Sequence, residues 1–147
     1  MMDRKPPSKR SEFAVFEEIQ TRWTDNDCYG HMNNAVHYSL FDSIINSWLI
    51  RRGFLDPHKG EMIGLVVQSG CAYHAELGYP DIITAGLRIA RIGNSSVQYE
   101  IGLFRNNSET SAADGFFVHA FVDAQSRKPI ALSKDQKQML LPLTQTA

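Results

Sequence analysis

The sequence predicts an α+β domain in which an antiparallel sheet of about five strands wraps around one long central helix. Three observations predict this class. Residues 33–53 carry apolar side chains at helical spacing, whereas the other apolar segments are rich in β-branched and aromatic residues. The connections between most of those segments are short, and short connections join antiparallel neighbours because parallel pairs need long crossovers.

The bulk properties of the chain predict one domain. It has 147 residues, of which 43% are hydrophobic, and this is enough for one packed core, expected over residues 12–147. Residues 1–11 hold Pro6 and Pro7 among charged residues and predict a disordered N-terminal tail. The formal net charge of −1 gives no overall field that favours nucleic acid or an anionic membrane as a partner.

The sequence also predicts a cytoplasmic location. No apolar run follows the basic residues of the opening segment, so this segment does not predict a secretory signal. No apolar run approaches the roughly 20 residues needed to cross a bilayer. Cys28 and Cys71 match no metal-ligand spacing, and we expect free thiols, with a disulfide between them as the alternative.

The first predicted elements are a strand and the helix. Residues 14–23 alternate in the manner of an amphipathic strand. Asn33 is a good N-cap for the helix, and Gly53 can take the left-handed conformation at its end, just after Arg51 and Arg52, whose charges suit the helix dipole. The helix is apolar around much of its girth and is therefore expected to be enclosed by the sheet. Its apolar positions are Ala35, Tyr38, Leu40, Phe41, Ile44, Ile45, Trp48 and Leu49.

Four further strands and a short helix follow. Residues 62–77 predict a strand that ends before Pro80. Residues 82–92 and 95–105 predict a hairpin with a tight turn at Gly93-Asn94. After a second turn at 106–111, residues 115–124 predict the last strand and residues 133–143 a terminal helix.

The start of the long helix is the candidate site. Asp27 and His31 lie on the loop that leads into a helix whose first backbone N–H groups have no intrahelical partner. These amides and the helix dipole suit a developing oxyanion, and an adjacent carboxylate can activate water or attack a carbonyl carbon. Each residue alone has a commoner structural role, as a cap, a turn or a hydrogen-bond partner, and only the cluster indicates chemistry.

Two stretches of the chain resemble a known family. The segment TDNDCYGHMNNAVHY resembles the active-site loop of hotdog-fold thioesterases, in particular the 4-hydroxybenzoyl-CoA thioesterase-like group, with its common form D-x-D-x-x-G-H-x-N-N-x-x-Y. The segment YHAELGYPDIITAGLRIARIGNSSVQYEIGLF resembles the strand, hairpin and strand of the same family. Together the two stretches carry the resemblance from Arg22 to about Asp123.

The resemblance implies an acyl-CoA thioesterase with no metal and no cofactor beyond the coenzyme A of the substrate. It makes Asp27 the nucleophile or general base, places the oxyanion amide near Asn34, and gives His31 a role in positioning water. Gly30 would let the backbone approach the substrate closely. Related acyl-carrier-protein thioesterases have asparagine where this chain has Tyr29. Asp42 on the helix is the reserve candidate for the acid, with solvation on the helix surface as its alternative.

The substrate carrier and the assembly are expectations of the same kind. The resemblance implies a homodimer or homotetramer, which would also cover an exposed sheet edge. The alternatives to an acyl-CoA thioesterase are an acyl-carrier-protein thioesterase, a hydratase or dehydratase of the same fold, and a non-catalytic acyl-CoA-binding protein. Phosphates favour basic side chains and backbone amides, although exposed charges are often simply solvated. The predicted coenzyme A contacts are Arg91, Ser95, Ser96, Arg127 and Lys128.

Overall fold

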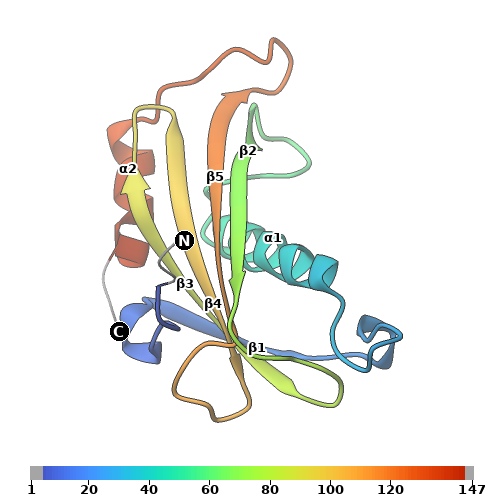
Figure 1. Ribbon diagram of the computed structural model, residues 1–147. Helices are drawn as coiled ribbons and strands as arrows, with labels where there is room; N and C mark the ends of the chain where they lie inside the picture. The colour runs from blue at the N-terminus through green and yellow to red at the C-terminus, as the bar shows by residue number, and fades with distance from the viewer. Residues whose placement is uncertain (1–4, 145–147) are drawn as a thin grey trace.

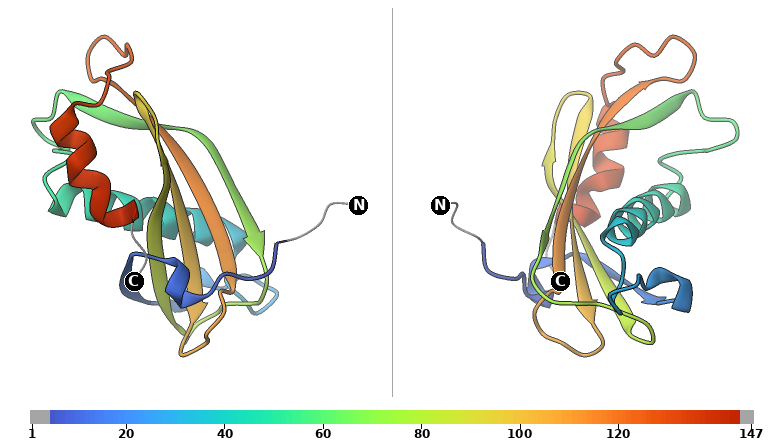
Figure 2. Two further views of the ribbon diagram at one scale, coloured as in Figure 1. Left: turned by 90° about the vertical axis from the view of Figure 1, so that its left-hand side faces the viewer. Right: turned by 45° about the vertical axis from the view of Figure 1, so that its right-hand side comes forward.

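The computed structural model describes residues 5–144, and these form a curved antiparallel sheet with α1 lying across one face (Figures 1 and 2). The five strands lie in the order β1-β3-β4-β5-β2, so β1 and β2 are the edges. The predicted α+β class and antiparallel sheet are confirmed. In chain order the strands and helices are β1 (Val15–Gln20), α1 (Asn34–Arg51), β2 (Met62–Tyr73), β3 (Ile82–Ile92), β4 (Ser96–Arg105), β5 (Ala113–Asp123) and α2 (Lys134–Leu140).

The strand boundaries follow the local sequence signals closely. The predicted β3–β4 hairpin is present, but its turn lies at Asn94-Ser95, one residue after the predicted Gly93-Asn94, because the Gly93 amide donates to the carbonyl of Ser96 at 2.7 Å. β2 ends four residues before its predicted limit, because the amides of His74 and Ala75 both donate to the Ala112 carbonyl, at 2.8 and 3.0 Å. The chain then leaves the sheet as the loop 74–81, which becomes one wall of the candidate site.

The helix α1 begins where predicted, but it is not enclosed. The Asn33 side chain caps it by accepting from the Ala35 amide at 2.9 Å. One stripe of side chains is buried against the sheet, while Ile50 and Asp42 on other faces are exposed. The sheet of one chain covers only one side of the helix. This corrects the prediction that the sheet wraps around the helix. The buried residues are His37, Phe41, Ile44, Ile45 and Leu49.

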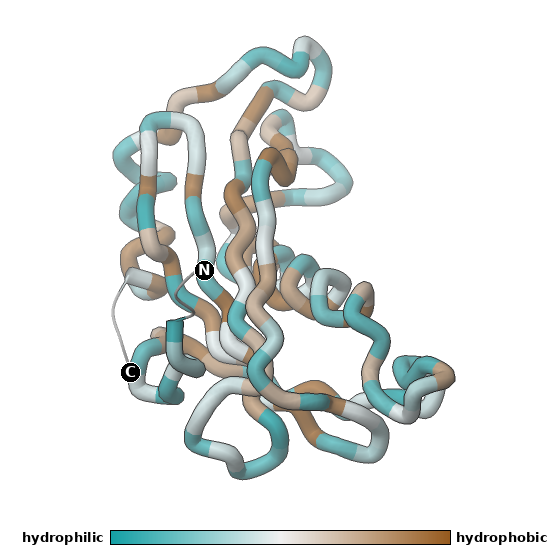
Figure 3. The backbone as a smooth tube through the Cα atoms, viewed as in Figure 1, coloured by the Kyte–Doolittle hydropathy of each residue, from teal (hydrophilic) through white to brown (hydrophobic). Residues whose placement is uncertain are grey.

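A hydrophobic core lies between the sheet and the helices. Leu140 of α2 and Leu143 of the 3₁₀ turn η3 (Leu141–Thr144) belong to the same buried cluster as α1 and the inward residues of β3 and β4. Ser133 caps α2 by accepting from the Gln136 amide. Figure 3 shows hydrophilic stretches in the connecting loops, and hydrophilic and hydrophobic residues alternating along the strands. No helix within residues 5–144 is long and apolar enough to cross a membrane.

Two polar side chains are buried together in this core. His119 on β5 and Tyr99 on β4 are 1% and 0% exposed, and the His119 Nδ1 lies 3.2 Å from the Tyr99 hydroxyl. Burial lowers the pKa of His119 to about 4, and burial also raises the pKa of Tyr99. Both groups are therefore neutral at physiological pH, and their mutual hydrogen bond offsets part of the desolvation.

Residues 5–11, which belong to the predicted disordered tail over residues 1–11, make defined contacts with distant parts of the chain, and this differs from the prediction for these residues. The Ser8 amide donates to the Ser111 hydroxyl at 2.9 Å and to the Asp114 carboxylate at 3.1 Å. Arg10 reaches across to the loop after β4, where it donates to the carbonyls of Asn106 and Ser108, both at 2.8 Å. The prolines and charges of this segment do not predict these long-range contacts. Residues 1–4 lie outside the described part of the chain.

Candidate active site

The first acid of the loop before α1 is structural. Asp25 ends the 3₁₀ turn η2 (Trp23–Asp25) and is 5% exposed. Its carboxylate accepts from the Arg22 amide and lies 2.8 Å from the Arg22 guanidinium, and this bond raises the pKa of Arg22. Its carbonyl accepts from the Asn33 amide at 2.9 Å. Asp25 therefore anchors the helix cap to the start of the loop.

The second acid, Asp27, is partly exposed, with 19% of its side chain accessible. A tight turn joins Asp27 to His31, in which the Asp27 amide donates to the His31 carbonyl at 2.9 Å and Gly30 takes a φ of +86°. A side chain with a Cβ rarely adopts this left-handed conformation, which explains the glycine. The Asp27 carboxylate accepts from the Tyr29 amide at 2.9 Å, and its other oxygen lies 4.0 Å from the His31 Nδ1. The turn thus places a carboxylate beside an imidazole.

The first turn of α1 leaves one backbone amide available. The Ala35 amide donates to the Asn33 side chain, and the Val36 amide donates to the Asn33 carbonyl at 2.9 Å. No hydrogen bond within residues 5–144 engages the Asn34 amide. This N–H lies at the positive end of the helix dipole, where a negatively charged oxygen is stabilised.

These groups surround one pocket. A cavity of about 480 Å³ lies at the start of α1, and Asp27, His31 and Asn34 all line it. The predicted Gly30 lines a neighbouring hollow of about 170 Å³ that shares His31. The structure therefore brings the four predicted residues to one place. The remaining lining residues are Tyr29, Met32, Asn33, His37, Tyr73, Ala75, Glu76 and Leu77.

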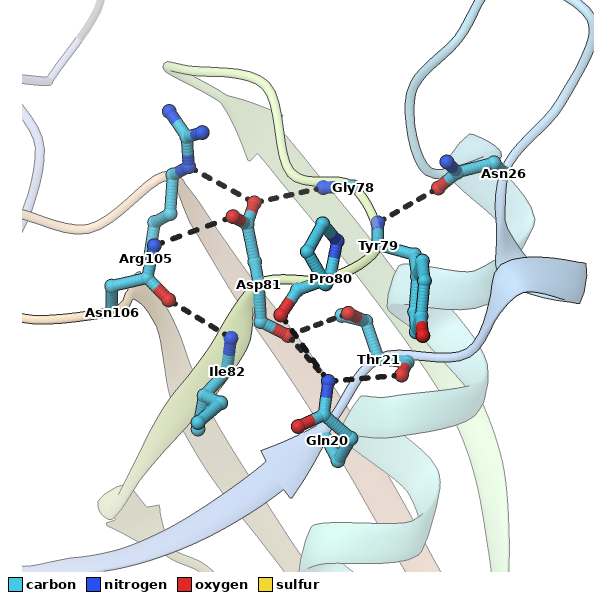
Figure 4. Close-up of polar contacts among 10 residues, drawn as sticks. All are labelled: Gln20, Thr21, Asn26, Gly78, Tyr79, Pro80, Asp81, Ile82, Arg105 and Asn106. Carbon is cyan, nitrogen blue, oxygen red and sulfur yellow. Dashed lines mark hydrogen bonds and ion pairs between the residues drawn. The ribbon is translucent and has the colours of Figure 1, made fainter.

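The loop 74–81 forms the opposite wall of the pocket. It is hydrogen-bonded to both ends of the loop that precedes α1. The Met32 amide donates to the Leu77 carbonyl at 2.6 Å, and the Tyr79 amide donates to the Asn26 side chain at 3.0 Å. Figure 4 shows how the loop closes on Asp81. These contacts connect the two walls of the pocket directly.

Asp81 is the centre of a polar cluster that holds this loop (Figure 4). Its carboxylate accepts from the Gly78 amide at 3.0 Å, the Arg105 Nε at 2.9 Å and the Asn106 side chain at 3.3 Å. Asp81 is 8% exposed, whereas the Arg105 side chain is 58% exposed. Hydration screens the charge of Arg105, so most of the stabilisation comes from the bonds of the buried carboxylate.

Replacing Asp81 with alanine is expected to lower the free energy of unfolding by about 2 kcal/mol, because the Gly78 amide and the Asn106 side chain lose a buried acceptor. Urea denaturation followed by circular dichroism measures this change. Glu109→Ala, at an exposed loop position, is the matched control and should shift the unfolding free energy by no more than about 0.5 kcal/mol. Equal stability of the two variants would contradict the role given to Asp81.

Among the lining residues that were not predicted from the sequence, two contact each other at the helix start. His37 and Tyr73 pack edge to face with ring centroids 4.8 Å apart, and the Tyr73 hydroxyl donates to the Asn34 carbonyl at 3.2 Å. Tyr73 comes from the end of β2, so only the fold brings it to the helix start. His37 did carry a signal, since it is a polar residue on the buried face of α1 and stands where the common form of the motif has tyrosine.

The other predicted residues lie away from the pocket. Asp42 is exposed on α1 and its carboxylate accepts from the Asn46 side chain at 3.1 Å. The predicted coenzyme A contacts lie at the β3–β4 hairpin, at the end of β3 and in the loop after β5. This is the end of the sheet opposite the loop that precedes α1 (Figure 1). Within one chain they do not reach the pocket.

A helix laid across one face of a curved, five-stranded antiparallel sheet is the arrangement of a hotdog-type domain. The chain belongs to the thioesterase-like superfamily, whose family model matches residues 21–140. This match covers both walls of the pocket and all the strands after β1.

The chain is also similar to solved structures and to a curated relative. The crystal structure of the PA5185 protein from Pseudomonas aeruginosa shares 46% identity, with a TM-score of 0.91 over 97% of this chain and 99% of that chain. The DHNA-CoA thioesterase of Staphylococcus aureus shares the fold, with a TM-score of 0.76 and 19% identity over 84% of this chain and 86% of that one. The uncharacterized protein YsmA of Bacillus subtilis is 22% identical over 132 residues, 90% of this chain and 88% of the relative.

Proposed function

We propose that the protein is an acyl-CoA thioesterase that hydrolyses a thioester to a carboxylic acid and free coenzyme A. The observation that carries the proposal is the pocket that Asp27 and Asn34 both line. A thioester carbonyl oxygen that accepts from the Asn34 amide presents its carbon to the side of the pocket where Asp27 lies. The positive end of the helix dipole stabilises the charge that develops on that oxygen.

The residues support a two-step hydrolysis. Asp27 accepts a proton from water while the water oxygen bonds to the carbonyl carbon, and the resulting oxyanion is held by the Asn34 amide. The oxyanion then re-forms the carbonyl, the C–S bond breaks, and the thiolate of coenzyme A takes up the proton. In the alternative route Asp27 attacks the carbon itself and water hydrolyses the mixed anhydride. His31, 4.0 Å from Asp27, orients the water in both routes.

A thiol-release assay with a panel of aliphatic and aromatic acyl-CoA esters tests the proposal. We expect turnover of at least one member of the panel, with release of one thiol for each acid formed. Single-turnover hydrolysis in oxygen-18 water separates the two routes, because only the nucleophilic route places solvent oxygen in the Asp27 carboxylate. Tight binding of acyl-CoA without any release would instead identify a non-catalytic binding protein.

We also propose that a second copy of the chain completes the coenzyme A site. β2 is an edge strand, and its consecutive residues Leu65, Val66 and Val67 are all exposed, Val67 to 62%. An edge of this kind is normally covered. Antiparallel pairing of two β2 strands reverses one chain relative to the other. The Arg91 and Arg127 end of one subunit would then approach the pocket end of its partner.

Replacing Val67 with lysine is expected to convert the oligomer into monomers, because a charge at the pairing edge loses its hydration when two strands join. Size-exclusion chromatography with light scattering measures the mass. Ile82→Lys is the matched control, since Ile82 is an exposed apolar residue of β3, which is not an edge strand. A V67K variant with the mass of the unmodified protein would contradict pairing through this edge.

A further inference from the structure

Glu76 is a second acid in the wall of the proposed active site. It is an exposed residue of the loop 74–81, which forms the wall opposite the start of α1. Glu76 lines both the pocket of about 480 Å³ and the neighbouring hollow of about 170 Å³, so it lies where the two meet. Together with Asp27, it gives the pocket two acidic side chains.

The carboxylate of Glu76 has no partner within the described part of the chain, where it makes no hydrogen bond and no salt bridge. The other acids near the pocket are compensated. Asp25 is paired with Arg22 at 2.8 Å. Asp81 is paired with Arg105 at 2.9 Å. The negative charge of Glu76 is therefore left to the solvent and to the molecule that enters the pocket.

No positive side chain offsets the two acids of the pocket. Among the described residues, no lysine or arginine lines it. Burial lowers the pKa of His37, so this imidazole is neutral at physiological pH. His31 lies 4.0 Å from Asp27, so a positive charge on His31 is matched by that carboxylate. In the proposed dimer, the arginines supplied by the second copy bind the phosphates of coenzyme A rather than the acyl group.

We propose that Glu76 determines specificity by excluding acyl groups that carry a carboxylate, so that the substrates are coenzyme A esters of uncharged acyl groups. A carboxylate that enters the pocket loses hydration and gains no cation. It also meets the charges of Glu76 and Asp27, and like charges repel more strongly in a cavity than in bulk water. An unpaired charge discriminates against the wrong ligand in this way. The inference rests on the proposed thioesterase function and names the substrate class for it.

The experiment compares kcat/KM for 5-methylhexanoyl-CoA and glutaryl-CoA. Their acyl groups have the same number of non-hydrogen atoms, but the first ends in an isopropyl group and the second in a carboxylate. We expect the unmodified protein to prefer the uncharged ester by about 100-fold. Glu76→Gln keeps the size of the side chain and removes its charge. This variant should lower the ratio about tenfold by raising kcat/KM for glutaryl-CoA, and should leave the value for the uncharged ester within about twofold.

Two controls test whether the effect is local and electrostatic. Glu109→Gln makes the same chemical change at an exposed position that does not line the pocket, and should leave the ratio unchanged. Raising NaCl from about 0.05 M to about 0.5 M should lower the ratio of the unmodified protein more than that of E76Q, because salt screens an exposed charge. If only other esters of the panel are turned over, the inhibition constants of these two esters against one of them give the same ratio.

The outcomes separate the two proposals. Thiol release with a ratio that E76Q leaves unchanged, or a preference of the unmodified protein for glutaryl-CoA, would overturn the role of Glu76 and keep the thioesterase function. An equal loss with both esters together with a lower melting temperature would make Glu76 structural and also overturn the inference. No release from either ester or from the wider panel would overturn the thioesterase function, and the inference would fall with it.

Discussion

Replacing Asp27 with asparagine is expected to lower kcat for thioester hydrolysis by about 10³-fold, because the side chain loses the charge needed to take a proton from water or to attack the carbonyl. The variant should fold normally. Asparagine keeps the side-chain oxygen that accepts from the Tyr29 amide, and the side chain at this position remains partly exposed. Steady-state thiol release measures the loss, and thermal unfolding checks the fold.

Asp42→Asn is the matched control for this prediction. It makes the same chemical change at an exposed position of α1 that does not line the pocket, and should leave kcat within about twofold of the unmodified value. If D42N were inactive and D27N active, the acid would lie on the helix and the proposed site would be wrong. Loss of activity in both variants would show that the pocket at the helix start is only part of the site.

The largest effect on stability is expected at Phe41, where alanine should lower the free energy of unfolding by about 4 kcal/mol. Phe41 is 0% exposed and packs its ring on Phe117 with centroids 6.2 Å apart. A side chain at Gly115 of β5 would overlap this ring, so α1 and the sheet approach each other closely here. Removing the ring therefore leaves a cavity that rigid strands cannot fill.

Urea denaturation of the F41A variant measures this loss as a lower urea concentration at the unfolding midpoint, with an unchanged m-value. Ile50→Ala is the control on the same helix. Ile50 is 42% exposed, so its truncation should change the unfolding free energy by no more than about 1 kcal/mol. A similar loss in both variants would mean that α1 is stabilised by its helical propensity rather than by packing on the sheet.

Local chemistry explains which features could be predicted from the sequence. The Asn33 cap, the β3–β4 hairpin and the limits of β3 depend on residues that are neighbours in the chain, and the structure has each of them where the sequence indicates. The active-site loop is also local, since Asp27, His31 and Asn34 lie within eight residues. For this reason one short segment was enough to predict three lining residues of the pocket.

The features that were missed depend on distant parts of the chain. Ser8 binds Ser111 and Asp114, more than a hundred residues away, so composition alone predicted disorder where the structure has order. The pocket wall formed by the loop 74–81 requires Asp81 to meet Arg105 from another strand. Neither contact leaves a periodic pattern in the sequence.

The sequence by itself determined the secondary structure, the antiparallel class and the helix start that carries the acid, because spacing, capping and turn preferences act between residues that are close along the chain. Only the tertiary structure decided which of the two acids is buried as an anchor and that one face of the helix stays uncovered. It also placed a neutral His37 in the wall of the pocket. The reason is physical: burial and the supply of hydrogen-bond partners depend on which strands and loops meet, and these set whether a polar side chain stabilises the fold or is available to a substrate.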